Sequence, residues 1–258
     1  MLQRNSMNFN YPEQEQIPQL LQLWKEVFGE YDGFWELFLE TGFLTDHCRC
    51  ITEQGQVLAG LYWFDCSCGD DKIAYIYAVV TAPGHRGKGL CRKLLEDVHA
   101  ILQDRGYASA MLVPADQGLR IMYQKMGYQD CSAISEFSCT AGKTALEVRR
   151  ICPEEFACLR RILLPQNGVL QEGITLAFLA AQAELFAGKD FLLAAWRESD
   201  TLHGLELLGN TSVAPEILRS LGCTHGVFQI PGSEKKHAMF HKIKDDARIP
   251  SYFGFSYD

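Results

Sequence analysis

Apolar positions in the first half of the chain switch between helical and strand spacing. Leu20, Trp24 and Phe28 recur every fourth residue, which indicates an amphipathic helix. Later stretches rich in valine, isoleucine and tyrosine are typical of strands. The pattern predicts helices over residues 17–28, 34–43, 90–102 and 118–126, and strands over residues 47–53, 57–68, 72–82, 108–113 and 128–139. The expected fold class is α+β, with a mixed sheet.

A small, polar stretch at residues 140–144 is a plausible linker. We therefore expect two domains, residues 1–140 and residues 145–258. The second half alternates between helices and strands as well. It predicts helices over residues 156–164, 174–186, 215–222 and 234–243, and strands over residues 146–151, 191–196, 202–208, 226–230 and 252–257.

The two halves also share a short sequence similarity. Residues 113–127 align without gaps to residues 230–244, and Tyr123 then lies opposite Phe240. The alternative is a chance similarity between two amphipathic helices that each follow a strand. We favour a tandem repeat whose second copy has diverged.

Composition and charge narrow the classes of function. The length of 258 residues favours two modest domains, and a hydrophobic content of 47% is enough for a sizeable core. A formal charge of −8 argues against nucleic-acid binding through a basic surface. No apolar stretch approaches the ~20 residues that span a bilayer. Residues 1–10 are polar, unlike a secretory signal. We expect a cytoplasmic protein that binds neither nucleic acid nor membrane.

Most of the ten cysteines lie in apolar, strand-like stretches. We interpret them as reduced core residues. The pairs Cys48/Cys50 and Cys66/Cys68 leave a metal site as the alternative, because residues two apart on a strand share a face. Structural zinc sites usually have two to four residues between paired ligands, so we expect no metal.

The segment over residues 75–95 carries the clearest chemical pattern. An apolar strand runs into Pro83, a glycine-rich turn follows, and a helix begins near Leu90. The first N–H groups of a helix lack intrahelical partners, and the helix dipole adds partial positive charge there. Glycines let the backbone approach an anion closely. With Arg86, Lys88 and Arg92 around it, the turn is predicted to bind phosphate.

Two other phosphate-binding motifs do not fit this turn. A Walker A loop needs Gly-Lys-Ser/Thr, but Lys88 lies between two glycines and no Ser or Thr follows. A Rossmann fingerprint needs a third glycine three residues after Gly89, where the chain has Arg92.

The turn Arg86-Gly-Lys-Gly-Leu-Cys91 resembles the [RQ]-x-x-G-x-[GA] motif of the GNAT superfamily of N-acetyltransferases. Cys91 departs from the motif but is small. The resemblance implies that acetyl-CoA is the cofactor, with its coenzyme A pyrophosphate on the N–H groups of the turn. It also implies that the preceding strand pairs with the pantetheine arm, and that one strand N–H polarises the thioester carbonyl. The implied cofactor-binding residues are Val79, Val80, Thr81, Arg86, Gly87, Lys88, Gly89, Leu90, Cys91 and Arg92.

A second motif supports the same family. Residues 116–128 are similar to its later helix at Tyr123, Lys125, Gly127 and Tyr128, whereas Asp116 and Leu119 replace the usual Asn and Ala. In the family this tyrosine often protonates the departing thiolate, so the resemblance implies that Tyr123 is a catalytic general acid. The alternative is that Tyr123 only packs or contacts the cofactor sulfur.

Other candidate groups are less specific. Asp65, Tyr75, Tyr77 and His47 lie on strands that could border the site, but each is more simply structural, and the general base stays unassigned. Cys91 could be a nucleophile at a helix N-terminus. It lacks an evident His or Asp partner, and we interpret it as a small filler.

The sequence thus predicts an N-acetyltransferase that moves an acetyl group from acetyl-CoA to a small-molecule or peptide amine. The alternatives are a non-catalytic acyl-CoA-binding module and a scaffold without cofactor. Since Phe240 cannot donate a proton and the second half has no similar glycine turn, we expect that half to be catalytically inactive. A homodimer is compatible with the sequence but not indicated by it.

Overall fold

The computed structural model describes residues 7–29 and 33–256. The chain divides into two compact units, and neither is a continuous stretch of sequence. The first contains the chain up to Asp65, Asp71–Leu112 and His241–Ala247. The second contains Cys66–Asp70, Val113–Phe240 and the chain from Arg248 onwards. None of the helices in the described ranges combines the length and apolar character that a bilayer crossing requires.

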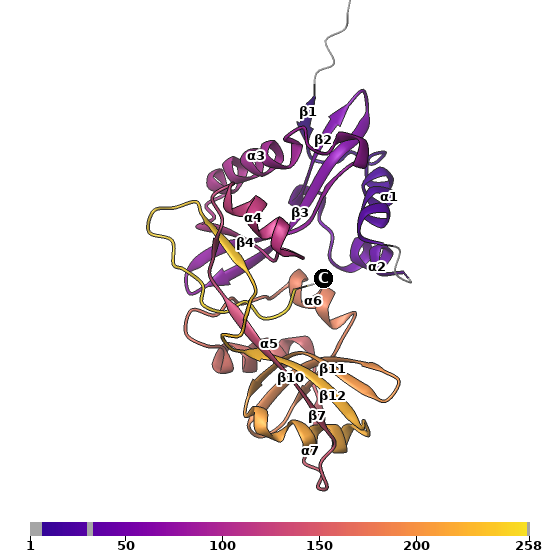
Figure 1. Cartoon of the computed structure of the whole chain (residues 1–258), viewed down its shortest axis with the longest axis vertical. Helices are drawn as coiled ribbons and strands as arrows, with labels where there is room; N and C mark the ends of the chain where they lie inside the picture. Colours follow the sequence, from indigo (N-terminus) through magenta and orange to yellow (C-terminus); the bar gives the residue numbers. More distant parts are fainter. Residues whose placement is uncertain (1–6, 30–32, 257–258) are drawn as a thin grey trace, which may run out of the picture. The chain divides into compact units, whose positions relative to one another are not determined.

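The first unit is built on a sheet in the order β1-β2-β3-β4-β5. Figure 1 shows α1 and α2 on one side of this sheet and α3 on the other. The last residues of β14 continue the sheet next to β5. The elements are β1 (Asn8–Asn10), α1 (Ile17–Phe28), α2 (Phe34–Thr41), β2 (Cys48–Glu53), β3 (Gln56–Cys68), β4 (Asp71–Thr81), α3 (Leu90–Asp104), β5 (Ser109–Leu112) and β14 (Met239–Lys242).

The core of this unit follows the alternation of β3. Tyr62 and Phe64 point to the face covered by α2, where both rings contact the ring of Phe38, at 5.0 and 6.0 Å between centroids. Trp63 lies on the opposite face, where the His47 ring stacks on it at 5.3 Å. Successive strand residues point to opposite faces, so one strand forms part of both aromatic layers.

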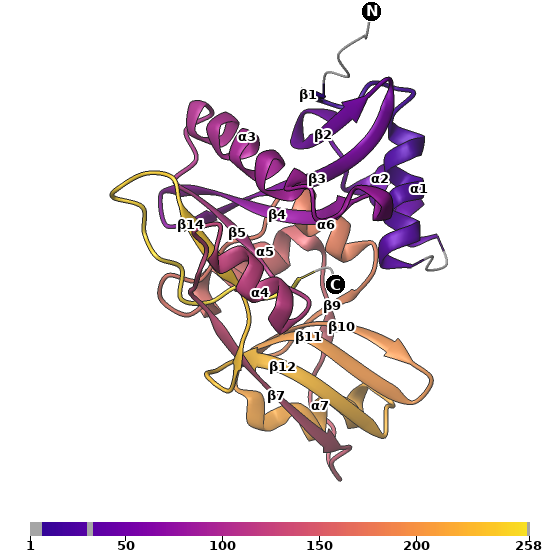
Figure 2. The same ribbon diagram turned by 45° about the horizontal axis from the view of Figure 1, so that its top comes forward.

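The second unit has a sheet in the order β8-β9-β10-β11-β12-β7-β13. One hydrophobic core of this unit packs α7 against β10, β11 and β12, around Leu193, Leu207 and Phe228. Figure 2 shows the same elements from another direction. They are α4 (Gln117–Gln124), β6 (Gln129–Asp130), β7 (Ala133–Thr140), β8 (Arg149–Arg150), α5 (Pro153–Leu163), α6 (Ile174–Ala180), β9 (Glu184–Ala187), β10 (Phe191–Glu198), β11 (Thr201–Gly209), α7 (Ala214–Leu221), β12 (His225–Pro231) and β13 (Lys235–Lys236).

The topology repeats. In both sheets three consecutive strands are neighbours, a helix follows, and a fourth strand pairs in parallel with the third: β4 with β5, and β11 with β12. Two helices precede each set of strands, α1 and α2 or α5 and α6. The tandem α+β arrangement is therefore confirmed.

The sequence alignment that suggested the repeat nevertheless pairs unlike elements. It places the helix α4 opposite a segment that forms the strands β13 and β14, so the helix expected over residues 234–243 was wrong. Phe240 is accordingly a strand residue, not the helical counterpart of Tyr123. The cause is a short apolar run, Ala238 to Phe240, which periodicity cannot assign to helix or strand. Pairing with β6 decides in favour of strand.

Four other expected elements differ from the structure. The helix expected over residues 174–186 ends at Ala180, and its last part is the strand β9. The strand over residues 128–139 is interrupted between β6 and β7, and the strand over residues 146–151 shrinks to β8. In the terminal stretch over residues 252–257, Tyr252 makes an isolated bridge to Gly168, and residue 257 lies outside the described residues.

A buried ion pair connects α5 and β11 in the second unit. Arg160 on α5 donates to both carboxylate oxygens of Glu206 on β11, at 2.6 and 2.9 Å, and both side chains are almost completely buried. Arg160 also donates to the carbonyl of Val169, and the hydroxyl of Tyr252 donates to Glu206 at 3.0 Å. Each buried charge is thus matched by several hydrogen bonds, as burial of an ion pair requires.

We predict that Arg160→Met will lower the free energy of unfolding by about 3–5 kcal/mol, because it leaves the Glu206 carboxylate buried without its counter-charge. Denaturant titration would measure the loss. Arg161→Met is the matched control, since Arg161 makes a similar two-bonded pair with Glu172 in a more exposed position. Equal effects of the two substitutions would contradict the prediction.

Candidate functional site

The strand β4 leaves its neighbour halfway along its length. Its parallel ladder with β5 covers Ile73 to Tyr75, and β4 then continues to Thr81. Beyond Tyr75, among the described residues, β5 provides no backbone partner for this edge of β4. An extended ligand could pair with this part of β4 as an added strand would. Val79, Val80 and Thr81 all lie in this part of β4.

A backbone irregularity occurs at Ala78, three residues beyond the end of the ladder with β5. Ala78 has φ of +50°, a conformation in which a residue with a Cβ is uncommon. Its carbonyl accepts a hydrogen bond from the indole N–H of Trp24 on α1 at 2.9 Å, and the Trp24 side chain is fully buried. Such strain persists only where surrounding contacts enforce it. The hydrogen bond from the Trp24 indole therefore stabilises a local break in the pleat of β4.

The glycine turn follows directly after β4. Gly87 and Gly89 have φ of +75° and +76°, the left-handed region that glycine enters without steric cost. An added Cβ at either glycine would meet no atom within 4 Å, so their backbones face open space. Gly89 is the N-cap of α3 and has no side-chain cap. The turn is therefore shaped by backbone conformation and leaves room for a ligand.

The start of α3 presents backbone N–H groups. The first intrahelical bond runs from the N–H of Lys93 to the carbonyl of Gly89, at 3.1 Å. The N–H groups of Leu90, Cys91 and Arg92 precede it and have no intrahelical acceptor. With 15 residues, α3 is long enough for its dipole to favour an anion at this end.

Positive side chains surround the same turn. Arg86, Lys88 and Arg92 are exposed, and the Nε of Arg86 donates to the carbonyl of Thr81 at 3.2 Å. This bond ties the turn to the end of β4. Burial raises the pKa of the Cys91 thiol to about 11, against a lowering by Arg92. Cys91 is thus protonated at neutral pH, which fits the interpretation as a small filler.

Tyr123 belongs to the second unit, on α4. The side chain of Asp116 caps this helix by accepting the N–H of Leu119 at 2.7 Å. The ring of Tyr123 is buried and meets Tyr128 edge to face, at 5.7 Å between centroids. The expected cofactor residues therefore come together in the first unit, whereas the expected acid lies in the second. Their cooperation stays a prediction.

The residues around Tyr123 form a Schellman cap. The N–H of Tyr128 donates to the carbonyl of Tyr123 at 3.1 Å, and that of Gly127 to Gln124 at 3.0 Å. Gly127 has φ of +90°, and the ring contact is the hydrophobic pair that usually accompanies this cap. The spacing Tyr-x-x-x-Gly-Tyr thus has a complete structural explanation for the backbone and the rings.

The four candidate bases do not converge on one point. His47 stacks on Trp63, and burial is the main reason why its pKa is lowered. On the opposite face, Tyr75 and Tyr77 belong to the aromatic layer of Phe64. Asp65 accepts a hydrogen bond from the hydroxyl of Tyr107 and pairs with Lys72 at 3.4 Å. Each has a structural role.

Sequence reasoning missed Trp24 and Ala78 as parts of the site. Trp24 was expected only in a helix stripe, and an alanine gives no indication of a positive φ. The described residues contain no group of three or more His, Cys, Asp or Glu side chains that could hold a metal ion.

Comparisons with known proteins give one family match and several solved structures with a similar fold. Residues 8–131 match the family described as acetyltransferase (GNAT) domain. A GCN5-related N-acetyltransferase from Anabaena variabilis superimposes with a TM-score of 0.72 at 15% identity, covering 93% of this chain and 73% of that one. A GCN5-related N-acetyltransferase from Kribbella flavida superimposes with a TM-score of 0.69 at 15% identity, covering 91% of this chain and 70% of that one. A putative acetyltransferase from Pyrococcus horikoshii superimposes with a TM-score of 0.66 at 14% identity, covering 99% of this chain and 96% of that one. The comparison with curated proteins finds no match.

We predict that Trp24→Phe will destabilise the protein by about 1–3 kcal/mol, because the buried carbonyl of Ala78 loses its donor. Trp35→Phe is the matched control. The indole of Trp35 donates to the carbonyl of Gly29, which is partly exposed and can bind water instead. Unfolding midpoints in denaturant would compare the two variants, and a smaller loss for Trp24→Phe would refute the role of this bond.

Proposed function

We propose that the chain, whose residues 8–131 match the acetyltransferase (GNAT) domain family, is an N-acetyltransferase that moves an acetyl group from acetyl-CoA to an amine. The observation that carries the proposal is the part of β4 beyond its ladder with β5, which leads into an N-terminus of α3 that has no side-chain cap. An extended arm that ends in phosphates has the shape and charge for this combination. The acceptor, a small-molecule or peptide amine, and a cytoplasmic location belong to the same proposal.

The turn and the strand would each bind a different part of acetyl-CoA. N–H groups from Gly87 to Cys91 would hold the pyrophosphate, with Arg86, Lys88 and Arg92 adding charge. The N–H and carbonyl groups of Val79 to Thr81 would pair with the pantetheine arm. The break at Ala78 would turn a neighbouring N–H toward the thioester carbonyl, as an oxyanion-hole donor.

The chemistry is a direct acyl transfer. Acetyl-CoA supplies an activated thioester carbonyl. The neutral amine forms the new C–N bond, the C–S bond breaks, and the sulfur leaves with the bonding electron pair. Tyr123 would donate its phenolic proton to that sulfur, the amine would lose its extra proton to solvent, and Tyr123 would regain a proton from water. No change of oxidation state is needed.

We predict that acetyl-CoA at ~100 times its dissociation constant will stabilise the wild-type protein by about 2.7 kcal/mol. The charge reversal Arg86→Glu should abolish the thermal shift, because it places a carboxylate beside the phosphate site. Lys143→Glu makes the same change at an exposed position outside the turn and should leave the shift intact. A folded wild-type protein that shows no shift would contradict the coenzyme site.

We further predict that Tyr123→Phe will lower kcat by about 10²–10⁴-fold, the usual contribution of a general acid, without changing acetyl-CoA binding. Tyr128→Phe is the matched control, because both substitutions preserve the ring contact of the helix cap. Steady-state kinetics with an amine found by screening would separate the two. Equal activities would leave Tyr123 a structural residue. Coenzyme binding without turnover of any amine would favour the alternative, a non-catalytic acyl-CoA-binding module.

A further inference from the structure

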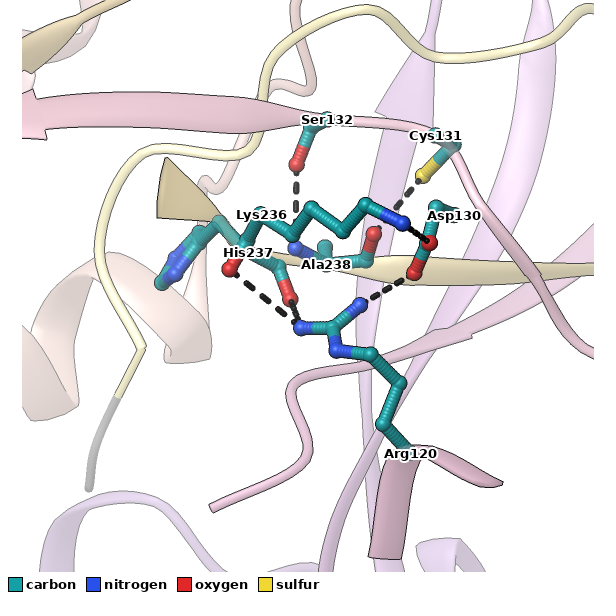
Figure 3. Close-up of polar contacts among 7 residues, drawn as sticks. All are labelled: Arg120, Asp130, Cys131, Ser132, Lys236, His237 and Ala238. Atoms are coloured by element: carbon teal, nitrogen blue, oxygen red, sulfur yellow. Dashed lines mark hydrogen bonds and ion pairs between the residues drawn. The ribbon is translucent and has the colours of Figure 1, made fainter. Parts of the chain in front are cut away.

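Two strand interruptions face each other in the second unit. The gap between β6 and β7 covers Cys131 and Ser132, and the gap between β13 and β14 covers His237 and Ala238. The carbonyl of Ala238 accepts hydrogen bonds from the N–H groups of Cys131 and Ser132 at 3.2 and 3.4 Å. The N–H of Ala238 donates to the Ser132 hydroxyl at 3.1 Å. The returning segment, residues 235–240, is thus held along β6 and β7 even where regular pairing stops (Figure 3).

The interruption leaves backbone carbonyls that require other donors. The side chain of Arg120 on α4 donates hydrogen bonds to these carbonyls. One guanidinium nitrogen donates to the carbonyl of His237 at 2.8 Å and to that of Lys236 at 3.3 Å, and another donates to the Asp130 carboxylate. Only 6% of Arg120 is exposed. In Figure 3 its side chain reaches from the helix to both strands.

Charge is matched around this contact. Asp130 on β6 also accepts a hydrogen bond from the ammonium of Lys236 at 2.6 Å. Partial burial raises the pKa of Asp130, but the hydrogen bonds from Lys236 and Arg120 outweigh it and hold that pKa below its usual value. The carboxylate is therefore charged at neutral pH and pairs with both cations.

The contact fixes the position of α4. Arg120 and Tyr123 are three residues apart, which places them as neighbours on one side of the helix. The Schellman cap at Gly127 fixes the end of the helix, and Arg120 fixes the preceding turn. The helix is too short, at eight residues, to keep its rotation without such anchors.

We propose that Arg120 is a positioning residue for Tyr123, and that the returning segment 235–240 takes part in catalysis by holding Arg120. This inference rests on the proposed function, since it gives Tyr123 the role of the acid. It assigns a task to the late part of the chain that is independent of any catalytic group there.

Arg120→Lys tests the proposal, because lysine keeps the charge but lacks the planar fork that serves three acceptors at once. Arg149→Lys is the matched control, an exposed arginine of the same unit that pairs with Glu155. Asp130→Asn provides a second variant if Arg120→Lys does not fold, since it keeps the side-chain shape and removes the carboxylate charge that pairs with Arg120 and Lys236.

Hydrogen exchange tests the contact without any assay of activity. Amides in a peptide that covers residues 117–128 should exchange faster in Arg120→Lys and Asp130→Asn than in wild type and Arg149→Lys. Amides of α3, in the other unit, should be unchanged. Unaltered exchange in residues 117–128 would overturn the proposal, whatever the activity.

Kinetics test the link to Tyr123. Arg120→Lys should lower kcat by about 10- to 100-fold, the loss expected when a reacting group is misplaced by ~1 Å, while the dissociation constant of acetyl-CoA is unchanged. The same change in a Tyr123→Phe background should lower kcat no further, because residues that act through one another are non-additive.

The outcomes separate the two claims. Faster exchange with unchanged kcat, or full additivity in the double variant, would overturn the positioning role. A wild-type protein without turnover would refute the proposed function and with it the positioning role, and exchange would then report the anchoring of α4 alone.

Discussion

Backbone groups that leave regular pairing need other partners, and this requirement governs the molecule at three places. At Ala78 the pleat of β4 breaks, and the indole of Trp24 takes the carbonyl. Between β13 and β14 the ladder breaks, and Arg120 takes the carbonyls of Lys236 and His237. At the start of α3 the N–H groups of Leu90 and Cys91 have no intrahelical acceptor. The first two places are satisfied by large buried side chains, whereas the third follows the open glycine turn and lies beside exposed positive charge. That difference distinguishes a structural irregularity from a place built for a ligand.

The glycine turn could be predicted because its chemistry is local. Gly87 and Gly89 are needed for their backbone angles, so residue types alone reveal the turn. Ala78 could not be predicted, because alanine normally avoids a positive φ and the bond that enforces it comes from a helix far away in sequence. The same limit explains the strand β14. Its apolar run fits a helix or a strand, and only pairing with β6, more than a hundred residues earlier, decides between them. Arg120 was missed for the same reason, since a helical arginine gives no indication that carbonyls from a distant segment will meet it.

The repeat has a consequence for domain organisation. The strand β7 follows the first set of elements in sequence but pairs with β12 in the second unit. The last residues of β14 come late in the sequence but continue the sheet of the first unit next to β5. Each copy thus gives a strand to the sheet of the other. A fragment that ends at residue 140 would lack His241–Ala247, which belong to the compact first unit. The domain boundary expected at residues 140–144 stays a prediction, while the compact units include segments from both sides of it.

Tyr123 illustrates how structural and chemical demands can be separated at one residue. The Schellman cap needs Gly127 for its positive φ and benefits from two apolar rings, and a phenylalanine would satisfy the ring contact as well as a tyrosine. The hydroxyl therefore adds nothing to the cap itself. A tyrosine hydroxyl on a buried ring usually finds a polar partner. The hydroxyl is thus the part of Tyr123 that the proposed acid role uses and the cap contacts do not. The cap fixes α4 after Tyr123, and Arg120 fixes it before Tyr123. The fold therefore holds the Tyr123 hydroxyl in position, although the cap does not require that hydroxyl.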